Sequence, residues 1–413
     1  MRTLLFFLAV MNAHAQSGPQ VQLSHTAESL RGVSAVSRQI AWASGTHGTY
    51  LRTIDAGHTW TPAQLPGAEA LDFRAVVAFS AVEAFLMSAG PGDQSRIYHT
   101  VDAGQHWQLQ FTNSNPKGFF DSMAFWDATH GIVLGDPVPD ETGELKFELF
   151  LTTDGQTWTP IPRSQLPPAE PGEAAFAASN SCLAILRATA QSPMQPWKSG
   201  ASAPRQLGKN EGASAPGSND PNIWFATGGR VARVFHSPDL GRTWQVFDTP
   251  ITHGPDSAGI FSVAFRDATH GVIVGGDYKH PNQDGDNLAF TSDGSKTWTL
   301  PQIHPQAYFS AVAYDRLSFR PEQSVPERNG RGVEEPAVRL DRRELPAKNL
   351  NENQAAPRIF IVAPKFIFDF RPPHDPTRIS PGKKSLTQFN ALSPYPDGGA
   401  LFVGPNGSIA TIP

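Results

Sequence analysis

The sequence predicts an all-β fold, a seven-bladed β-propeller of four-stranded antiparallel blades that is closed by strands from both ends of the chain. Two observations lead to this fold. A phrase containing an aspartate, a glycine and a tryptophan, such as SPDLGRTW (237–244), occurs five times and ends a unit of about 50 residues. The chain also has 36 glycines and 37 prolines while 17% of its residues are charged, which is typical of many short strands joined by tight turns.

The first fifteen residues have the features of a secretory signal peptide. Arg2 provides a positive charge, residues 4–11 are apolar, and Ala13 and Ala15 form a small-residue cleavage site. We therefore expect cleavage after Ala15 and export to the periplasm or the extracellular space. A membrane anchor is the alternative, but no apolar run is long enough to span a bilayer. Residues 1–15 are thus expected to be a signal peptide and residues 16–413 a single propeller domain.

Each unit has the same internal order. It opens with an alternating apolar strand, such as FRAVVAF (73–79), and continues with a strand that ends on small residues, such as VLGD (133–136). A third strand enters the recurrent phrase, whose tryptophan begins the fourth. We expect seven units, which begin near Leu30, Phe73, Phe120, Ala174, Phe261, Phe309 and Phe389. The last unit has room for three strands, so residues 20–26 are expected to supply its outer strand and leave no open edge.

The recurrent phrase is interpreted as a structural hairpin turn. Aspartate accepts N–H bonds within a turn, glycine adopts positive φ at little cost, and a large ring at a fixed place suits packing on the blade. The aspartates lie 47, 52, 85 and 54 residues apart, and removal of an insertion at 187–222 restores the common spacing. The structural residues are Asp55, Gly57 and Trp60; Asp102, Gly104 and Trp107; Asp154 and Trp158; Asp239, Gly241 and Trp244; and Asp293 and Trp298. Catalytic or metal-binding aspartates are the alternative, which a propeller disfavours by holding these turns apart around its rim.

This pattern, S/T-x-D-x-G-x-T-W, resembles the Asp-box, or BNR repeat. Sialidases, other glycosidases, sortilin-type receptors and the photosystem II stability/assembly factor family use it. The phrases FSVAFRDATHGVIVGGD (261–277) and FNALSPYPDGGALFVGPNGSIA (389–410) look most like the last of these families. The resemblance covers about 30–310 and 389–413. It implies a non-enzymatic propeller outside the cytoplasm that assists the assembly of a membrane protein complex.

Two long acidic loops indicate a candidate binding surface. In a propeller, the loops between the second and third strands lie on one face near the central channel, and residues 136–144 and 277–287 form such loops. Asp136 and Asp277 follow equivalent strands and are expected to point towards the channel mouth. Tyr278 and His280 are candidate neighbours in this binding surface. The alternative is that each aspartate caps its own turn.

A sialidase-like glycoside hydrolase or a glycan-binding protein is the alternative function. The chain has no R-I-P motif, and a hydrolase built on Asp136 and Asp277 would need their carboxylates about 5–9.5 Å apart. Asn282, Asp284 and Asp286 have the spacing of calcium ligands, but the downstream glutamate of an EF-hand loop is missing. We therefore assign no catalytic residue, no metal ligand and no cofactor.

The remaining composition limits the classes of partner. The net charge is −5, and no basic block lies outside 315–385, which argues against nucleic acid. Cys182 is the one cysteine, so an internal disulfide is excluded and the fold depends on core burial. We expect a monomer that binds a protein partner, with a membrane complex as the candidate.

One segment, residues 315–385, departs from the repeat. Arginine, proline, glutamate and asparagine dominate it, and it contains no Asp-box. It is either a disordered insertion or the product of a reading-frame shift in the gene. Residues 359–370 remain a candidate source of strands for the sixth unit.

Overall fold

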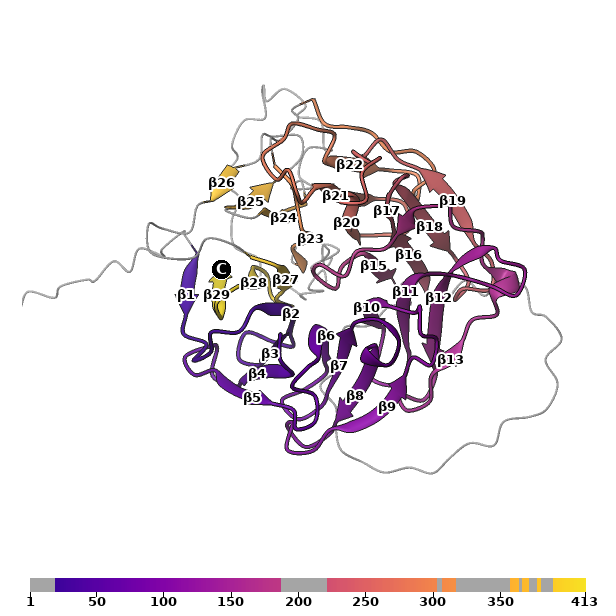
Figure 1. Ribbon diagram of the computed structural model, residues 1–413. Helices are drawn as coiled ribbons and strands as arrows, with labels where there is room; N and C mark the ends of the chain where they lie inside the picture. Colours follow the sequence, from indigo (N-terminus) through magenta and orange to yellow (C-terminus); the bar gives the residue numbers. More distant parts are fainter. Residues whose placement is uncertain are drawn as a thin grey trace, which may run out of the picture.

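The computed structural model describes residues 19–186, 221–302, 307–316, 357–363, 366–370, 377–379 and 389–413. Its sheets radiate around a central channel, so the fold is an all-β propeller (Figure 1). The expected signal peptide and almost all of the expected insertion at 187–222 lie outside the described residues, as does most of 315–385. Within the described residues, no helix is long and apolar enough to cross a bilayer.

Six sheets are four-stranded and antiparallel, each with its first strand innermost in the ring. From the inside outwards, the first three sheets are β2 (Leu30–Ala35), β3 (Ala41–Gly45), β4 (Thr49–Thr53) and β5 (Thr61–Gln64); β6 (Asp72–Ala78), β7 (Ala84–Ala89), β8 (Arg96–Thr100) and β9 (Gln108–Thr112); and β10 (Phe120–Phe125), β11 (Gly131–Pro139), β12 (Leu145–Thr152) and β13 (Thr159–Pro160). The fourth sheet is β15 (Leu183–Leu186), β16 (Asn222–Ala226), β18 (Arg233–Ser237) and β19 (Gln245–Asp248). The last two four-stranded sheets are β23 (Ala311–Tyr314), β24 (Ile359–Ala363), β25 (Phe366–Phe370) and β26 (Thr377–Ile379); and β27 (Ala391–Pro394), β28 (Ala400–Gly404), β29 (Ser408–Ile412) and β1 (Gln20–Gln22). Two single-turn 3₁₀ helices, η1 (Gly92–Gln94) and η2 (Arg163–Gln165), lie in connecting segments.

The expectation of seven four-stranded blades is wrong, because the structure has six such blades. The other sheet has five strands in the order β14 (Glu173–Ala174), β17 (Gly228–Gly229), β20 (Ala258–Phe265), β21 (Gly271–Asp277) and β22 (Leu288–Thr291). It gains two short strands at its inner edge and lacks a regular fourth strand at its outer edge. Both departures have a cause in the sequence.

At the inner edge, two glycines let the backbones of β17 and β20 meet. Gly228 pairs with Gly259, and a Cβ on Gly259 would lie 2.2 Å from the Gly228 Cα. At the outer edge, β22 makes only an isolated bridge between Phe290 and Thr299. Continuing this antiparallel register places Pro301 opposite Leu288, and proline has no N–H to extend the ladder.

The two ends of the chain close the ring as expected. The N-terminal strand β1 pairs with the C-terminal strand β29, from Gln20 opposite Thr411 to Gln22 opposite Ile409. Residues 359–370 supply β24 and β25 of the sheet that follows the five-stranded one. The fourth unit differs from expectation, because its innermost strand begins at Leu183 rather than near Ala174.

The hydrophobic core is divided among the contacts between neighbouring sheets. One cluster, for example, joins Trp42 and Tyr50 of the first sheet to Phe73 and Leu86 of the second. The innermost and second strands carry most of the fully buried side chains, and the outer strands β5 and β9 are largely exposed. This arrangement keeps the strand ends around the channel at defined positions.

Candidate functional site

A β-bulge displaces one residue in the innermost strand of three sheets and in β20 of the five-stranded sheet. The register of β2, β6, β10 and β20 shifts at Arg31, Arg74, Asp121 and Phe261 respectively. A bulge re-aims the side chain of its extra residue. Arg31 and Arg74 interact electrostatically, and so do Arg74 and Asp121. The bulge residues of three consecutive blades therefore meet around the channel.

Two guanidinium groups share one carboxylate at this end of the channel. Arg74 Nε lies 2.9 Å from Asp72 Oδ2, and Arg31 Nε lies 3.9 Å from Asp72 Oδ1. Arg31 Nε makes no hydrogen bond within the described residues. Burial and the charge of Arg74 lower the pKa of Arg31, but a guanidinium remains protonated in proteins. Arg31 therefore has donor capacity for an anion.

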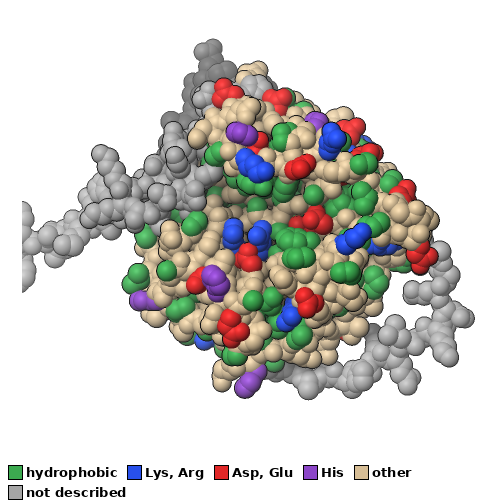
Figure 2. All heavy atoms as spheres, viewed as in Figure 1, with side chains coloured by type: hydrophobic (Ala, Val, Ile, Leu, Met, Phe, Trp, Pro, Cys, Tyr) green, Lys and Arg blue, Asp and Glu red, His purple; other side chains and the backbone are tan. Residues whose placement is uncertain are grey.

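Aromatic side chains form the adjoining wall. Phe176 stacks on Phe261 with ring centroids 4.0 Å apart, and Tyr308 meets Phe261 edge-on at 4.8 Å. Tyr308 is buried close to Arg31, and this burial raises the pKa of its hydroxyl. Tyr278 packs edge-on against Phe261 at 6.1 Å and is 48% exposed. We call Arg31, Asp72, Arg74, Phe261 and Tyr308 the channel mouth. Figure 2 shows basic, acidic and hydrophobic side chains side by side near the middle of the ring.

Residues 173–181 cross the channel, and we call them the plug. They precede β15 and reach the centre of the ring (Figure 1). Their hydrogen bonds run to four different sheets: Ala175 N to Asp136 Oδ1 (2.9 Å), Arg74 Nη1 to Ala177 O (2.8 Å), Ser179 Oγ to Ser310 O (2.7 Å), Met123 N to Asn180 Oδ1 (2.7 Å) and Val263 N to Ser181 O (2.9 Å). The plug therefore forms the floor of the channel mouth, and Arg74 is held by it.

A buried carboxyl group, Asp121, and a half-buried one, Asp136, lie behind the channel mouth. Burial, together with Asp136, raises the pKa of Asp121 well above its ordinary value. Burial likewise raises the pKa of Asp136 to about 6, although the Ala175 N–H opposes this. One oxygen of Asp121 has no hydrogen-bond partner among the described residues. Burial therefore disfavours the charged form of Asp121, and the printed ion pairs of Arg31 and Arg74 are with Asp72.

The four residues predicted to form a binding surface do not make one cluster. Asp136 is half-buried and accepts a hydrogen bond from the plug. Asp277 accepts from the backbone of Lys279 and contacts His280 Nδ1 at 2.7 Å, so it caps its own turn. Although burial opposes it, the hydrogen bonds within this turn lower the pKa of Asp277. Of the four, Tyr278 lies beside the channel mouth, and the exposed His280 ring remains on its loop.

The Asp-box residues form hairpin turns at the outer part of the sheets. In the first box, Thr53 Oγ1 donates to Asp55 Oδ1 at 2.9 Å, while the Thr59 and Gly57 N–H groups donate to Asp55 Oδ1 and Thr53 Oγ1. Gly57 has a φ of +80°. The same bonds recur at Asp102, Asp154, Asp239 and Asp293, and the pKa of each of these aspartates is lowered. Each carboxylate is thus engaged within its own turn.

The sequence did not lead us to predict the arginines of the channel mouth as site residues. Their signal is the residue that follows the first apolar position of a unit, as in LRGV (30–33), FRAV (73–76) and FDSM (120–123). This residue interrupts the alternation of the innermost strand, because it occupies the bulge. Within the described residues, no group of three or more histidine, cysteine, aspartate or glutamate side chains is placed to hold a metal ion.

Comparison with known proteins confirms the resemblance to the photosystem II assembly factors. The photosystem II assembly protein Ycf48 of Synechococcus sp. (strain JA-2-3B'a(2-13)) is 23% identical over 277 residues, which cover 57% of this chain and 78% of that protein. The match is in sequence and does not depend on the fold. No protein-family model matches the chain.

Solved structures of related propellers share the fold. YCF48 bound to D1 peptide superimposes with a TM-score of 0.55 and 12% identity, over 95% of this chain and 96% of that one. YCF48 from Cyanidioschyzon merolae gives a TM-score of 0.51 and 13% identity, over 96% of this chain and 98% of that one. The chain is therefore a β-propeller similar to Ycf48.

Proposed function

We propose that the protein is an exported, non-enzymatic assembly factor that binds an extended segment of a protein partner at the channel mouth. The placement of Arg31 and Arg74 around the single carboxylate of Asp72 carries this proposal. Charge-assisted hydrogen bonds from arginine to carboxylate are among the strong ones in proteins. Among the described residues Arg31 Nε makes no hydrogen bond, and the Arg31 side chain is partly exposed. A similar propeller, YCF48, has been solved with a D1 peptide bound, which supports a peptide ligand.

The chemistry of the channel mouth defines the ligand. A carboxylate, from an acidic side chain or a chain terminus, would pair with Arg31. An apolar side chain next to it would cover the ring of Tyr278, which is half exposed beside Phe261. Aromatic and arginine anchors of this kind supply much of the binding energy of protein interfaces. The plug closes the floor, so the ligand lies across the mouth and does not thread the channel.

The proposed partner is a membrane protein complex, by analogy with the named role of the Synechococcus relative in photosystem II assembly. Export of this chain is proposed from the positive residue, apolar run and small-residue site within 1–15. A hydrolase is not favoured. Asp136 is bonded to the plug and Asp277 to its own turn, so these carboxylates do not act as a pair.

The test is affinity capture of the tagged mature protein from the cell envelope after mild crosslinking, followed by mass spectrometry. We expect repeated enrichment of one membrane complex by the wild type and loss of this enrichment by Arg31→Gln. Gln keeps a donor at this position but removes the charge, and the loss of one charge-assisted bond corresponds to about a tenfold or greater weakening. Arg74 is left intact because it also holds the plug.

Arg38→Gln is the matched control. Arg38 pairs with Asp397 at 3.0 Å in the turns on the opposite face of the ring, so its replacement should leave capture unchanged. Enrichment that survives Arg31→Gln, or that is lost equally in Arg38→Gln, would contradict a site at the channel mouth. No enrichment in the wild type would contradict the assembly role itself.

A further inference from the structure

The turns of the first two sheets expose three aliphatic side chains. Ile54 of the first Asp-box is 59% exposed, Val101 of the second box is 65% exposed, and Val82 of the turn between β6 and β7 is 48% exposed. Within the described residues, the exposed large hydrophobic side chains number seven, so three of the seven lie on these turns. We call Ile54, Val82 and Val101 the aliphatic tips.

Hydrogen bonds hold these turns against one another. The Ala103 N–H of the second box donates to Val82 O at 2.9 Å. Arg52, two residues before Ile54, reaches from the first sheet to the second and donates to Ala81 O at 2.5 Å. The aliphatic tips therefore belong to one surface that crosses the boundary between the first two sheets. Because β6 runs from the channel mouth to the turn at Val82, this surface is on the opposite face of the ring.

The Asp-box turn itself does not require an aliphatic residue at this place. Ile54 and Val101 are the second residues of their boxes, and the other boxes have different residues there: Thr153, Pro238 and Ser292. A backbone N–H bond to the aspartate nevertheless recurs in all five boxes. Single exposed hydrophobic residues are ordinary on protein surfaces, but a group of them on neighbouring turns is typical of an interaction surface.

A cavity of about 290 Å³ adjoins the aliphatic tips. Val101 lies in its wall, together with polar side chains of the second sheet and one of the third: His99, Asp102, His106, Gln108 and Gln156. Gln110 Nε2 donates to Gly155 O at 2.9 Å and so links the two sheets. A polar cavity with an apolar rim therefore lies between the second and third sheets.

Negative charge surrounds the aliphatic tips. A backbone N–H within each turn donates to the carboxylate of Asp55 and to that of Asp102, and these bonds lower the pKa of Asp55 and lower that of Asp102 to about 2. Glu83 adds a carboxylate on the turn between β6 and β7. Arg52 also reaches these turns, but it is partly buried over the Trp42 ring. The surface therefore attracts a cation, most directly at the cavity that Asp102 lines.

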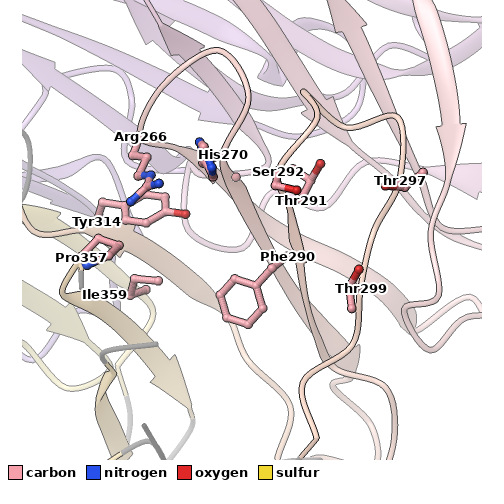
Figure 3. A pocket seen from close by; sticks show the side chains of 11 residues that line it. Arg266, His270, Phe290, Thr291, Ser292, Thr297, Thr299, Tyr314, Pro357 and Ile359 are labelled. Atoms are coloured by element: carbon pink, nitrogen blue, oxygen red, sulfur yellow. The ribbon is translucent and has the colours of Figure 1, made fainter. Parts of the chain in front are cut away.

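A second cavity formed by the turns of this face differs in charge. Its volume is about 340 Å³, and Arg266 stands in its wall with the hydroxyl groups of Ser292 and Thr297 (Figure 3). Among the described residues that line it, none carries a carboxylate. A cationic side chain therefore finds a carboxylate partner in the cavity beside Asp102 and not in this one.

We propose that the aliphatic tips and the cavity beside Asp102 form an interaction surface for a partner polypeptide. A lysine or arginine side chain of the partner enters the cavity, and neighbouring aliphatic side chains cover the tips. Charge complementarity selects such a partner, and burial of the aliphatic side chains adds affinity. The channel mouth, with Arg31 and Arg74, suits an acidic ligand. The two faces therefore select segments of opposite charge, and this inference does not depend on the first.

A fluorescein-labelled, capped octapeptide of sequence GKLVKLVG is the probe, and its binding to the mature protein is followed by fluorescence anisotropy. GELVELVG reverses the charge, and GKSSKSSG removes the aliphatic side chains. We expect saturable binding of GKLVKLVG and at least tenfold weaker binding of each comparison peptide. Added salt should weaken the binding, because exposed charges are screened.

Val101→Ser and Asp102→Asn test the two parts of the surface. Each should weaken the binding of GKLVKLVG about tenfold, the first through a lost apolar contact and the second through a lost charge. Val21→Ser is the matched control for the first, because Val21 is 59% exposed on β1, the outer strand of another sheet. Asp293→Asn is the matched control for the second, because it makes the same change in the Asp-box of the five-stranded sheet. Both controls should bind like the wild type.

Three outcomes would overturn the proposal. The first is the absence of saturable binding by the wild type, or equal binding by the wild type, Val101→Ser and Asp102→Asn. The second is equal weakening by Asp102→Asn and Asp293→Asn, which would reflect a general change in the Asp-box turns. The third is binding to phosphatidylcholine vesicles that Val101→Ser abolishes, without binding of the peptide, which would identify a lipid surface in place of a polypeptide.

Discussion

At the scale of single residues, the residue at the bulge position of each strand determines which side chain lies at this end of the channel. Arg31, Arg74, Asp121 and Phe261 occupy the same extra position in their strands, so two guanidinium groups, a carboxyl group and an aromatic ring are brought to one end of the ring of blades. Each bulge interrupts the ladder of hydrogen bonds at that one residue. Of these side chains, Arg31 and Arg74 are partly exposed and available for binding, whereas Asp121 and Phe261 are buried.

Asp136 should lower the stability of the protein at neutral pH. Its pKa is raised to about 6 from 3.8, so between about pH 4 and pH 6 the folded state retains a proton that the unfolded state has released. Stability therefore falls as the pH rises through this window. Asp136→Asn keeps an acceptor for the Ala175 N–H, and we expect it to raise the free energy of unfolding at pH 7 by about 1–3 kcal/mol. Urea denaturation at pH 4, 5, 6 and 7 measures this difference.

Asp277→Asn is the control of opposite sign. Hydrogen bonds to the ionised carboxylate lower the pKa of Asp277, so its contribution is present above the ordinary carboxyl pKa and is lost as the pH falls through the lowered one. The amide should destabilise the protein at pH 7 and have little effect at the acid end. A flat pH profile for wild type and Asp136→Asn alike would contradict the buried, proton-retaining carboxyl.

At the scale of elements, the blade tolerates the loss of an outer strand but not of its inner contacts. The five-stranded sheet lacks a regular fourth strand beyond the Phe290–Thr299 bridge, yet β21 remains fully buried. At its inner edge the added strands β17 and β14 connect directly to the plug. The glycine pair at Gly228 and Gly259 is therefore the point where this sheet supports the site.

Gly259→Ala should separate β17 from β20. Its Cβ would lie 2.2 Å from the Gly228 Cα, and its φ of +149° is strained for alanine. We expect a loss of about 2–5 kcal/mol in the free energy of unfolding. Gly254→Ala is the matched control, since its φ is +118° with nothing within 4 Å of the added Cβ, and it should lose about 1–2 kcal/mol. Equal losses in denaturant melts would show that the close approach is unimportant.

At the scale of the whole molecule, the ring is held shut by a strand from each end of the chain. Gln22 of β1 links this closure to the first Asp-box: its Nε2 donates to Ala56 O at 3.0 Å, and its Oε1 accepts from Trp60 Nε1 at 2.9 Å. Trp60 in turn packs between the first and last sheets. The first box therefore takes part in closing the ring.

Gln22→Ala should loosen this closure. Two hydrogen bonds are lost, and the buried Trp60 N–H is left without its acceptor, so we expect a cost of about 1–3 kcal/mol. The exposed Gln20→Ala in the same strand should remain within about 0.5 kcal/mol of the wild type. Thermal denaturation followed by near-ultraviolet circular dichroism measures both, and an unchanged transition for Gln22→Ala would contradict a closing role.

The repeat was predicted well from the sequence, but the side chains that line the channel mouth were not. The five boxes were predicted because each depends on residues close in the chain. The terminal closure was predicted because the last unit has room for three strands only. The expectation of four strands in every blade was wrong for the five-stranded sheet. Its two inner strands begin at Glu173 and Gly228, which are far apart in the sequence. Asp136 and Asp277 were predicted to share a binding surface, but each carboxylate is hydrogen-bonded to a different partner. Asp136 accepts from the plug, and Asp277 contacts His280 of its own turn.

The sequence by itself determined the propeller class, the Asp-box turns and the resemblance to the assembly factors, because these follow from local periodicity and turn chemistry. Tertiary structure alone decided which side chains line the channel mouth. Arg31 and Arg74 are 43 residues apart and meet only when the ring closes and a bulge turns each one inward.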